Sequence, residues 1–135
     1  MRRSLAVAVG TAVLVLVPAG IAGAHPLGNF TVNHSDALLF TPDGVDFRAV
    51  VDRAEIPTAQ ELQDIAPDGE PSAATLARAA AADCGTLADD VVLTVDGSRV
   101  PWQLGSTTLE VVPGTAGLPT LRLTCSPASS WPAPR

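Results

Sequence analysis

The sequence predicts a mainly β protein: an immunoglobulin-like β-sandwich of about six strands with two short inserted helices, behind an N-terminal signal peptide. Three observations support this prediction. Short segments that alternate apolar and polar residues recur along the chain, separated by turns rich in Pro and Gly. The middle of the chain holds helix-capping residues and an alanine-rich run. The first 24 residues are basic at the start and then apolar.

Residues 1–24 have the pattern of a secretory signal peptide. Arg2 and Arg3 provide the positive start, residues 5–24 carry no charge, and the small residues 22–24 form an A-x-A cleavage site. A stretch of this length is also long enough to span a bilayer, so a retained membrane anchor is the alternative. We expect cleavage after Ala24, which leaves an extracytoplasmic β-rich domain over residues 25–125.

The mature chain is predicted to begin with a β-hairpin. Its two strands are expected over residues 30–40 (FTVNHSDALLF) and 45–56 (VDFRAVVDRAEI), which have β-type alternation. Between them, Pro42 presets φ and Gly44 accepts positive φ, so the segment 41–44 favours a tight turn.

Two helices are expected next. Pro57 is predicted to end the second strand, and Thr58 and Glu61 have the spacing of a capping box for a helix that runs to about Ile65. A second helix is expected over the alanine-rich residues 73–82, because Ser72 is a good N-cap and alanine has the highest helix propensity. Gly85 is predicted to stop this helix.

The chain then returns to strands, which are predicted over 91–95, 99–104, 108–112 and 118–124. The first two flank Asp96-Gly97-Ser98, a strong hairpin signal. Residues 126–135 hold three Pro and three Ser, and we expect them to form an unpaired tail, the remnant of a linker.

Cys84 and Cys125 are the only cysteines. Export would place them in an oxidising compartment, where a disulfide is stable. Two cysteines so far apart in sequence do not resemble a structural zinc site, which takes four ligands in close pairs. The sequence therefore predicts a Cys84–Cys125 disulfide, with two free thiols as the alternative.

Composition and motifs argue against two classes of function. The chain carries 14 acidic and 8 basic residues, a net charge of −6, whereas a nucleic-acid binder needs clustered positive charge. The hydroxyl-rich segments have no His or acidic motif beside them, and Asp52, Glu55 and Glu61 suit solvation and helix capping. We therefore expect a protein that is not an enzyme.

His25 is the most suggestive residue for binding chemistry, because cleavage after Ala24 would make it the first residue of the mature chain. Its α-amine and imidazole would then chelate one metal ion, and such nitrogen ligands suit nickel, cobalt, copper and zinc. Pro26 has no N–H, which blocks a site built from the adjacent backbone amide. Further ligands must come from elsewhere. The alternative is that His25 belongs to a frayed terminus.

His34 and Asp36 are the predicted additional ligands. Strand alternation places both on the face that also carries Val32 and Leu38, about 6–7 Å apart along the strand. Such a pair can share one ion, or Asp36 can orient His34 as a ligand. A polar pair on the more apolar face indicates either a β-bulge or a functional pocket. The alternative is a structural hydrogen bond between the two side chains, without metal.

Four segments resemble a known family. The strings are HPLGNFTVNH (25–34), VDRAEIPT (51–58), LTVDG (93–97) and GLPTLRL (117–123). In their order and spacing they resemble the mature N-terminal domain of high-affinity nickel/cobalt transporter-like proteins of actinobacteria. The sequence departs from that family at Ser35, Arg53 and Ala59, where larger aromatic or apolar residues are expected.

This resemblance implies an exported β-rich domain that precedes a multi-helix membrane transporter for nickel or cobalt. No transmembrane helix follows residue 125, so we expect the chain to represent only the first part of such a protein, truncated before its transport domain. The expected partners are a divalent metal ion and that absent domain. The alternative function is a secreted binding or interaction module with no role in metal handling.

Overall fold

The computed structural model of the chain describes residues 27–130; the expected signal peptide (1–24) and His25 lie outside this range. The elements follow in the order η1 (Leu27–Phe30), β1 (Val32–Thr41), β2 (Gly44–Arg53), α2 (Glu55–Ile65), α3 (Ala73–Asp90), β3 (Leu93–Val95), β4 (Ser98–Val100), β5 (Gln103–Pro113), η2 (Thr115–Gly117) and β6 (Pro119–Ser130). The predicted six strands and two helices, with the helices between the second and third strands, are confirmed for these residues.

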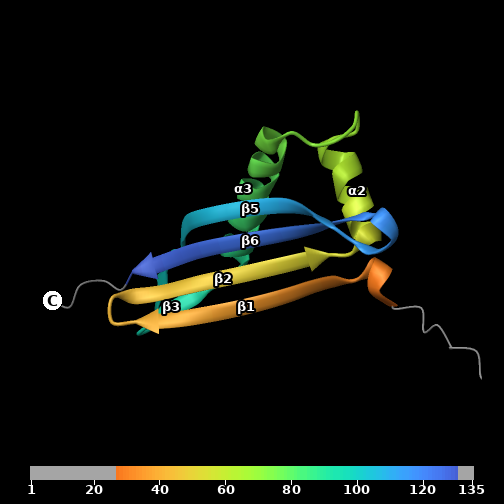
Figure 1. The fold of residues 1–135 in the computed structure, drawn as a ribbon. Helices are drawn as coiled ribbons and strands as arrows, with labels where there is room; N and C mark the ends of the chain where they lie inside the picture. The colour runs from red at the N-terminus through yellow and green to blue at the C-terminus, as the bar shows by residue number, and fades with distance from the viewer. Residues whose placement is uncertain (1–26, 131–135) are drawn as a thin grey trace, which may run out of the picture.

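Four long strands form one antiparallel sheet in the order β1-β2-β6-β5 (Figure 1). β2 and β6 lie at the centre, whereas β1 forms one edge and β5 the other. The first hairpin is confirmed, since Thr41 pairs with Gly44 across a two-residue turn. Gly44 is required there because a Cβ atom at this position would collide with the Ser129 carbonyl of β6.

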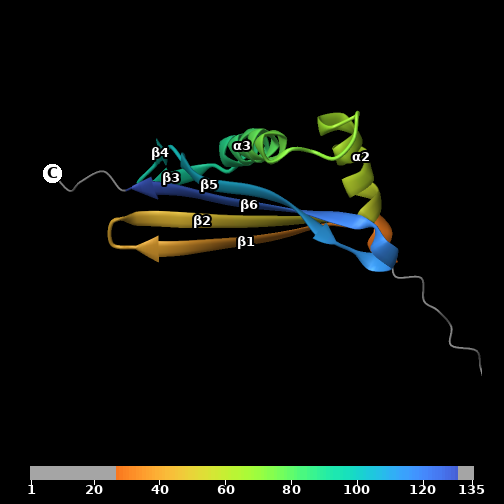
Figure 2. The same ribbon diagram turned by 45° about the horizontal axis from the view of Figure 1, so that its top comes forward.

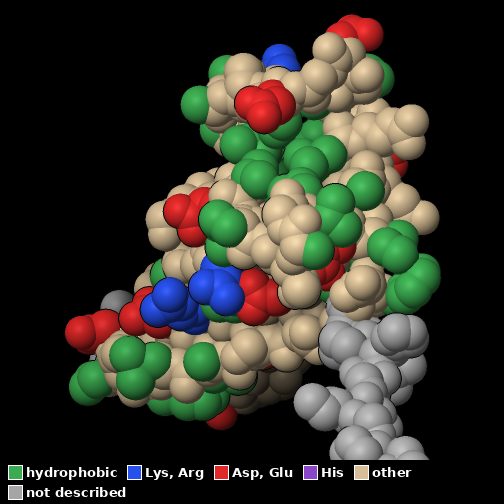
Figure 3. All heavy atoms as spheres, turned by 45° about the vertical axis from the view of Figure 1, so that its right-hand side comes forward, with side chains coloured by type: hydrophobic (Ala, Val, Ile, Leu, Met, Phe, Trp, Pro, Cys, Tyr) green, Lys and Arg blue, Asp and Glu red, His purple; other side chains and the backbone are tan. Residues whose placement is uncertain are grey.

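The core lies between one face of this sheet and helix α3, which packs against β5 and β6 (Figure 2). Alternate residues of the two central strands point into the core, as the β period requires. The buried residues of these strands are Val45, Phe47, Ala49, Val51, Leu121, Leu123 and Cys125, and α3 contributes Ala80, Cys84 and Ala88. The opposite face is polar: Arg122 donates to Asp52 at 2.7 Å, and Figure 3 shows basic and acidic side chains in contact.

The immunoglobulin-like sandwich is not the arrangement that the described residues adopt. A sandwich needs a second large sheet, but β3 and β4 form only a short two-stranded sheet. The predicted strand 99–104 is divided between β4 and β5 at Pro101 and Trp102. The layer over the main sheet is instead supplied mainly by α3, and Leu62 and Ile65 of α2 and Trp102 also pack against the core.

Helix α2 begins three residues before its predicted N-cap. Its first residue is Glu55, so Pro57 lies within the first turn, where a missing N–H costs no hydrogen bond. The predicted capping box is therefore wrong. Thr58 is buried and donates from its Oγ1 to the Arg53 carbonyl oxygen at 3.0 Å.

Helix α3 continues past its predicted end. Ser72 is the N-cap as predicted, and its Oγ accepts from the Thr75 N–H at 3.1 Å. Gly85, however, lies inside the helix. The helix persists to Asp90 because Cys84 and Ala88 pack on the sheet on both sides of this glycine.

The predicted tail is strand as far as the structure describes it. β6 extends to Ser130, and its last residues pair with β2 and with β5. Pro127 is buried in this central strand although it has no N–H to donate. The β5 register shifts opposite it, between Gln103 and Ser106, and this irregularity accommodates the proline.

Candidate functional site

His34 and Asp36 lie on the edge strand β1, on the side of the sheet that α3 covers. They are paired in register with Val51 and Ala49, whose side chains are buried on that side. The register from Val32 to Thr41 is continuous, so no bulge turns the two residues inward. Of the two explanations offered for this polar pair, a bulge is therefore excluded and a pocket remains.

Both residues border an open groove of about 420 Å³. The groove exists because α3 packs on β5 and β6 and leaves the β1 side of the sheet uncovered (Figure 2). Its floor includes Phe47, Val51 and Leu123, and its wall is formed by α3 through Asp83, Thr86, Leu87 and Asp90.

The α3 wall was missed by sequence reasoning. Residues 83, 86, 87 and 90 have the i, i+3, i+4, i+7 spacing of one helix face, which is a readable signal. The predicted helix ends near Gly85, so these four residues were not assigned to one helix and their common face was not predicted.

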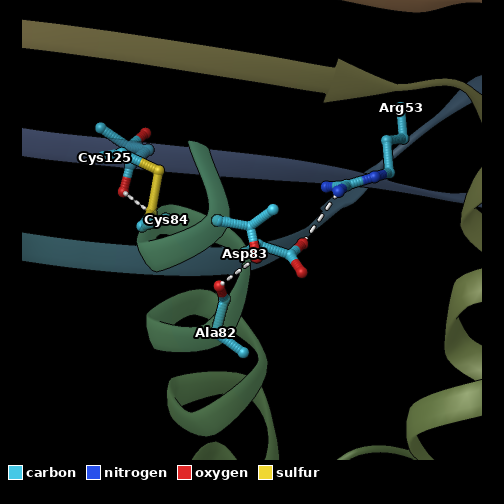
Figure 4. Close-up of a disulfide and its surroundings, with 7 residues drawn as sticks. Arg53, Ala82, Asp83, Cys84 and Cys125 are labelled. Carbon is cyan, nitrogen blue, oxygen red and sulfur yellow. Dashed lines mark hydrogen bonds and ion pairs between the residues drawn. A yellow bond between two sulfur atoms is a disulfide. The ribbon is translucent and has the colours of Figure 1, made fainter. Parts of the chain in front are cut away.

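Arg53 closes one end of the groove as the centre of an ion-pair cluster. Its Nε lies 3.1 Å from Glu61 Oε2 of α2, and its Nη2 lies 2.9 Å from Asp83 Oδ2 of α3 (Figure 4). Burial raises the pKa of Glu61 above its ordinary value, and Asp83 and Asp64 add to that effect, whereas Arg53 opposes it. Arg53 is thus the group that balances two neighbouring carboxylates.

The structure describes two of the three residues that were predicted to bind a metal ion. His34 and Asp36 face the same groove, but within residues 27–130 no group of three or more His, Cys, Asp or Glu side chains is placed to hold a metal ion. Asp83 and Asp90 of α3 also line this groove, and Asp83 is bound to Arg53. The predicted principal ligand, His25, lies outside the described residues.

The cysteine prediction is confirmed. Cys84 of α3 and Cys125 of β6 form a disulfide with their Cα atoms 5.5 Å apart, and both residues are fully buried (Figure 4). This bond attaches α3 to a central strand, and it therefore sets how far the helix lies from β1.

Glu55 has a role that sequence patterns did not indicate. Its side chain is only 8% exposed, and a carboxylate oxygen accepts from the Thr115 N–H at 3.0 Å. Hydrogen bonds from its own backbone N–H, first, and from that of Thr115 lower its pKa. Glu55 therefore connects the start of α2 to the β5–β6 connection rather than acting in the groove.

Comparison with protein-family models, with curated proteins and with solved structures finds no match for this chain. Within residues 27–130, neither helix is both long and apolar enough to cross a bilayer.

Proposed function

We propose that this chain is the extracytoplasmic N-terminal domain of a nickel/cobalt transporter-like membrane protein and that it binds a divalent transition metal. The ligands are His25 at the mature N-terminus, His34 and Asp36. The observation that carries the proposal is that His34 and Asp36 lie on the same side of β1 and open into one groove. In the sequence His25 stands two residues before η1, which directly precedes β1.

Two further features support a location outside the cytoplasm. The buried Cys84–Cys125 disulfide is characteristic of oxidising compartments. The first 24 residues have the signal-peptide pattern, and we propose that they are removed after Ala24.

The charge of the groove supports a cation as its ligand. Asp36, Asp83 and Asp90 contribute carboxylates around it, against one arginine that is already paired with Asp83. Metal binding would add positive charge where acidic side chains are in excess.

Nickel titration by isothermal calorimetry tests this proposal on the chain that begins at His25. We expect binding near one equivalent, and loss of binding when a glycine precedes His25, because the α-amine is then no longer next to the imidazole. His34→Ala and Asp36→Asn should each weaken binding. Asp46→Asn, which removes an exposed carboxylate from β2, is the matched control and should leave it unchanged. Equal affinity for the glycine-extended chain would contradict the terminal-histidine mechanism.

A second candidate is an interaction module without a metal role. It is favoured by β1, a ten-residue edge strand whose Leu38, Leu39 and Phe40 are exposed. Exposed apolar edge strands are common sites for the addition of another strand. A chain that binds no nickel but associates through β1 would support this second function.

A further inference from the structure

The outer edge of β1 presents free backbone groups. No other described strand pairs with this edge (Figure 1). The Ala54 N–H donates to the Thr31 carbonyl, so Thr31 bonds to the β2 side of the hairpin. In an antiparallel ladder hydrogen-bonded and non-hydrogen-bonded pairs alternate, so from Thr31 onward every second residue of β1 bonds to β2. The backbone of every second residue therefore points away from β2. These residues are Val32, His34, Asp36, Leu38 and Phe40.

β1 carries few of the features that normally protect an edge strand. It has no proline, no lysine or arginine, and no register shift, and its one charged residue is Asp36. The opposite edge, β5, contains a register shift and ends at Pro113. On β1, by contrast, Val32 is 46% exposed, Leu38 51% and Phe40 65%. This edge is suited to pairing with another strand.

We propose that the partner is a second copy of this chain, paired antiparallel through β1 about a two-fold axis at Ser35. In this register His34 of each copy lies opposite Asp36 of the other, and Val32 lies opposite Leu38. All four residues are on the helix side of the sheet. Each contact occurs twice, so two imidazole–carboxylate pairs and two apolar pairs face each other across the new edge.

Neighbouring registers lack this complementarity. Moving the axis to Asp36 places the two Asp36 carboxylates opposite each other, and moving it to His34 does the same with the two imidazoles. The first register opposes two like charges, which is destabilising, and the second places each Asp36 opposite Val32 instead of a histidine. The sequence of β1 therefore selects one register. The result is an eight-stranded sheet with both α3 helices on the same face, and α3 lies over β5 and β6, away from the new contact.

This inference rests on the second candidate function and names its partner. Sedimentation velocity on the chain from His25, with a chelator present to remove metal, measures the dimer directly. We expect a monomer–dimer equilibrium. His34→Asp places two acidic pairs across the interface and should raise the dissociation constant at least about tenfold. Combining it with Asp36→His restores the opposite pairing and should restore the dimer.

Crosslinking tests the register. Ser35→Cys places two thiols across the axis in a non-hydrogen-bonded pair, about 4.5 Å between Cα atoms, which permits a disulfide between copies. Ala37→Cys alone is the matched control, because its two copies would lie about 13 Å apart along the strands. Mixing Ala37→Cys with Asn33→Cys should give the heterodimeric crosslink.

Three results would overturn the proposal. These are a monomer at all concentrations, a dimer that His34→Asp leaves unchanged, and open-ended assemblies in place of a dimer. A monomer in chelator would leave the nickel titration unaffected, so failure of the dimer and failure of metal binding are distinguishable.

Discussion

At the residue scale, Glu55 is the carboxyl group most closely tied to the fold. Its pKa is lowered below the ordinary value of 4.5, first by its own backbone N–H and then by that of Thr115. Because the pKa of Glu55 is lower in the folded state, the unfolded state binds a proton at this group first as the pH falls below about 4.5. The stability that Glu55 contributes is therefore fully present above about pH 4.5 and is lost as the pH falls through its folded pKa.

We expect Glu55→Gln to be less stable than the wild type at pH 7 and closer to it at pH 3. At pH 7 the substitution replaces a charged acceptor with a neutral one and weakens its hydrogen bonds. At pH 3 Glu55 itself becomes protonated, so the wild type has lost the same charge. Urea unfolding at the two pH values measures the difference. Glu70→Gln, at an exposed position, is the control. A difference that is the same at both pH values would show that Glu55 does not contribute through its charge.

Gly85 offers a stabilising substitution. It lies within α3, and a Cβ atom at this position would meet no atom within 4 Å. Gly85→Ala should raise the free energy of unfolding by about 0.5–1 kcal/mol, because glycine loses more backbone entropy in a helix. Gly97→Ala is the contrasting control: it should destabilise, since Gly97 has a φ of 79°. Thermal unfolding of both variants tests this, and a lower midpoint for Gly85→Ala would contradict it.

At the scale of elements, Arg53 joins the end of β2 to both helices. Its side chain is 15% exposed and pairs with Glu61 of α2 and Asp83 of α3. Its Nη1 has no hydrogen-bond partner among the described residues. The guanidinium therefore acts mainly by balancing two carboxylates on separate helices.

Arg53→Met keeps the apolar part of the side chain and removes the charge. We expect a loss of about 1–3 kcal/mol in the free energy of unfolding, because Glu61 and Asp83 are left without their shared cation. Adding Glu61→Gln should recover part of the loss, since burial already disfavours that charge.

Arg78→Met, on an exposed position of α3, is the matched control for Arg53→Met and should change stability by no more than about 0.5 kcal/mol. Chemical denaturation measures all three variants. If Arg53→Met and Arg78→Met lose the same amount, the cluster contributes nothing specific.

At the scale of the whole molecule, the Cys84–Cys125 disulfide joins the two layers over a sequence separation of 41 residues. Closing a loop of this length restricts the unfolded chain, which is worth about 4 kcal/mol in the chain-entropy estimate. The double variant Cys84→Ala, Cys125→Ala should therefore lose about 2–5 kcal/mol in urea unfolding. A loss below about 1 kcal/mol would mean that α3 is held on the sheet by packing alone.

Local signals were reliable where the chain needs no distant partner. The Pro42–Gly44 turn, the Asp96-Gly97 hairpin and the Ser72 N-cap were all predicted, and the structure confirms them. The hairpin and the cap depend on backbone preferences or hydrogen bonds within a few residues. The first turn forms where predicted, but Gly44 does not have the positive φ expected of it and is needed for its close approach to Ser129. The shared face of His34 and Asp36 was predicted for the same reason, since strand alternation is local.

Signals that compete with long-range packing failed. Gly85 does not end α3, because Cys84 and Ala88 gain burial on the sheet that outweighs a weak helix propensity. Pro127 does not end β6, because β5 shifts its register opposite it. The groove was not predicted, because its wall is formed by residues 83–90 of α3, which lie beyond the predicted end of that helix.

The amino-acid sequence by itself determined the hairpin turns, the Ser72 cap, the cysteine pair available for oxidation and the alternation that places His34 and Asp36 on one face. Each of these follows from torsional preferences and spacing along one short segment. Only the tertiary structure decided that a helix, rather than a second sheet, covers the core, and that β1 is left with an open edge above a groove. Those outcomes depend on which surfaces far apart in the chain bury each other best, and no local preference encodes that competition.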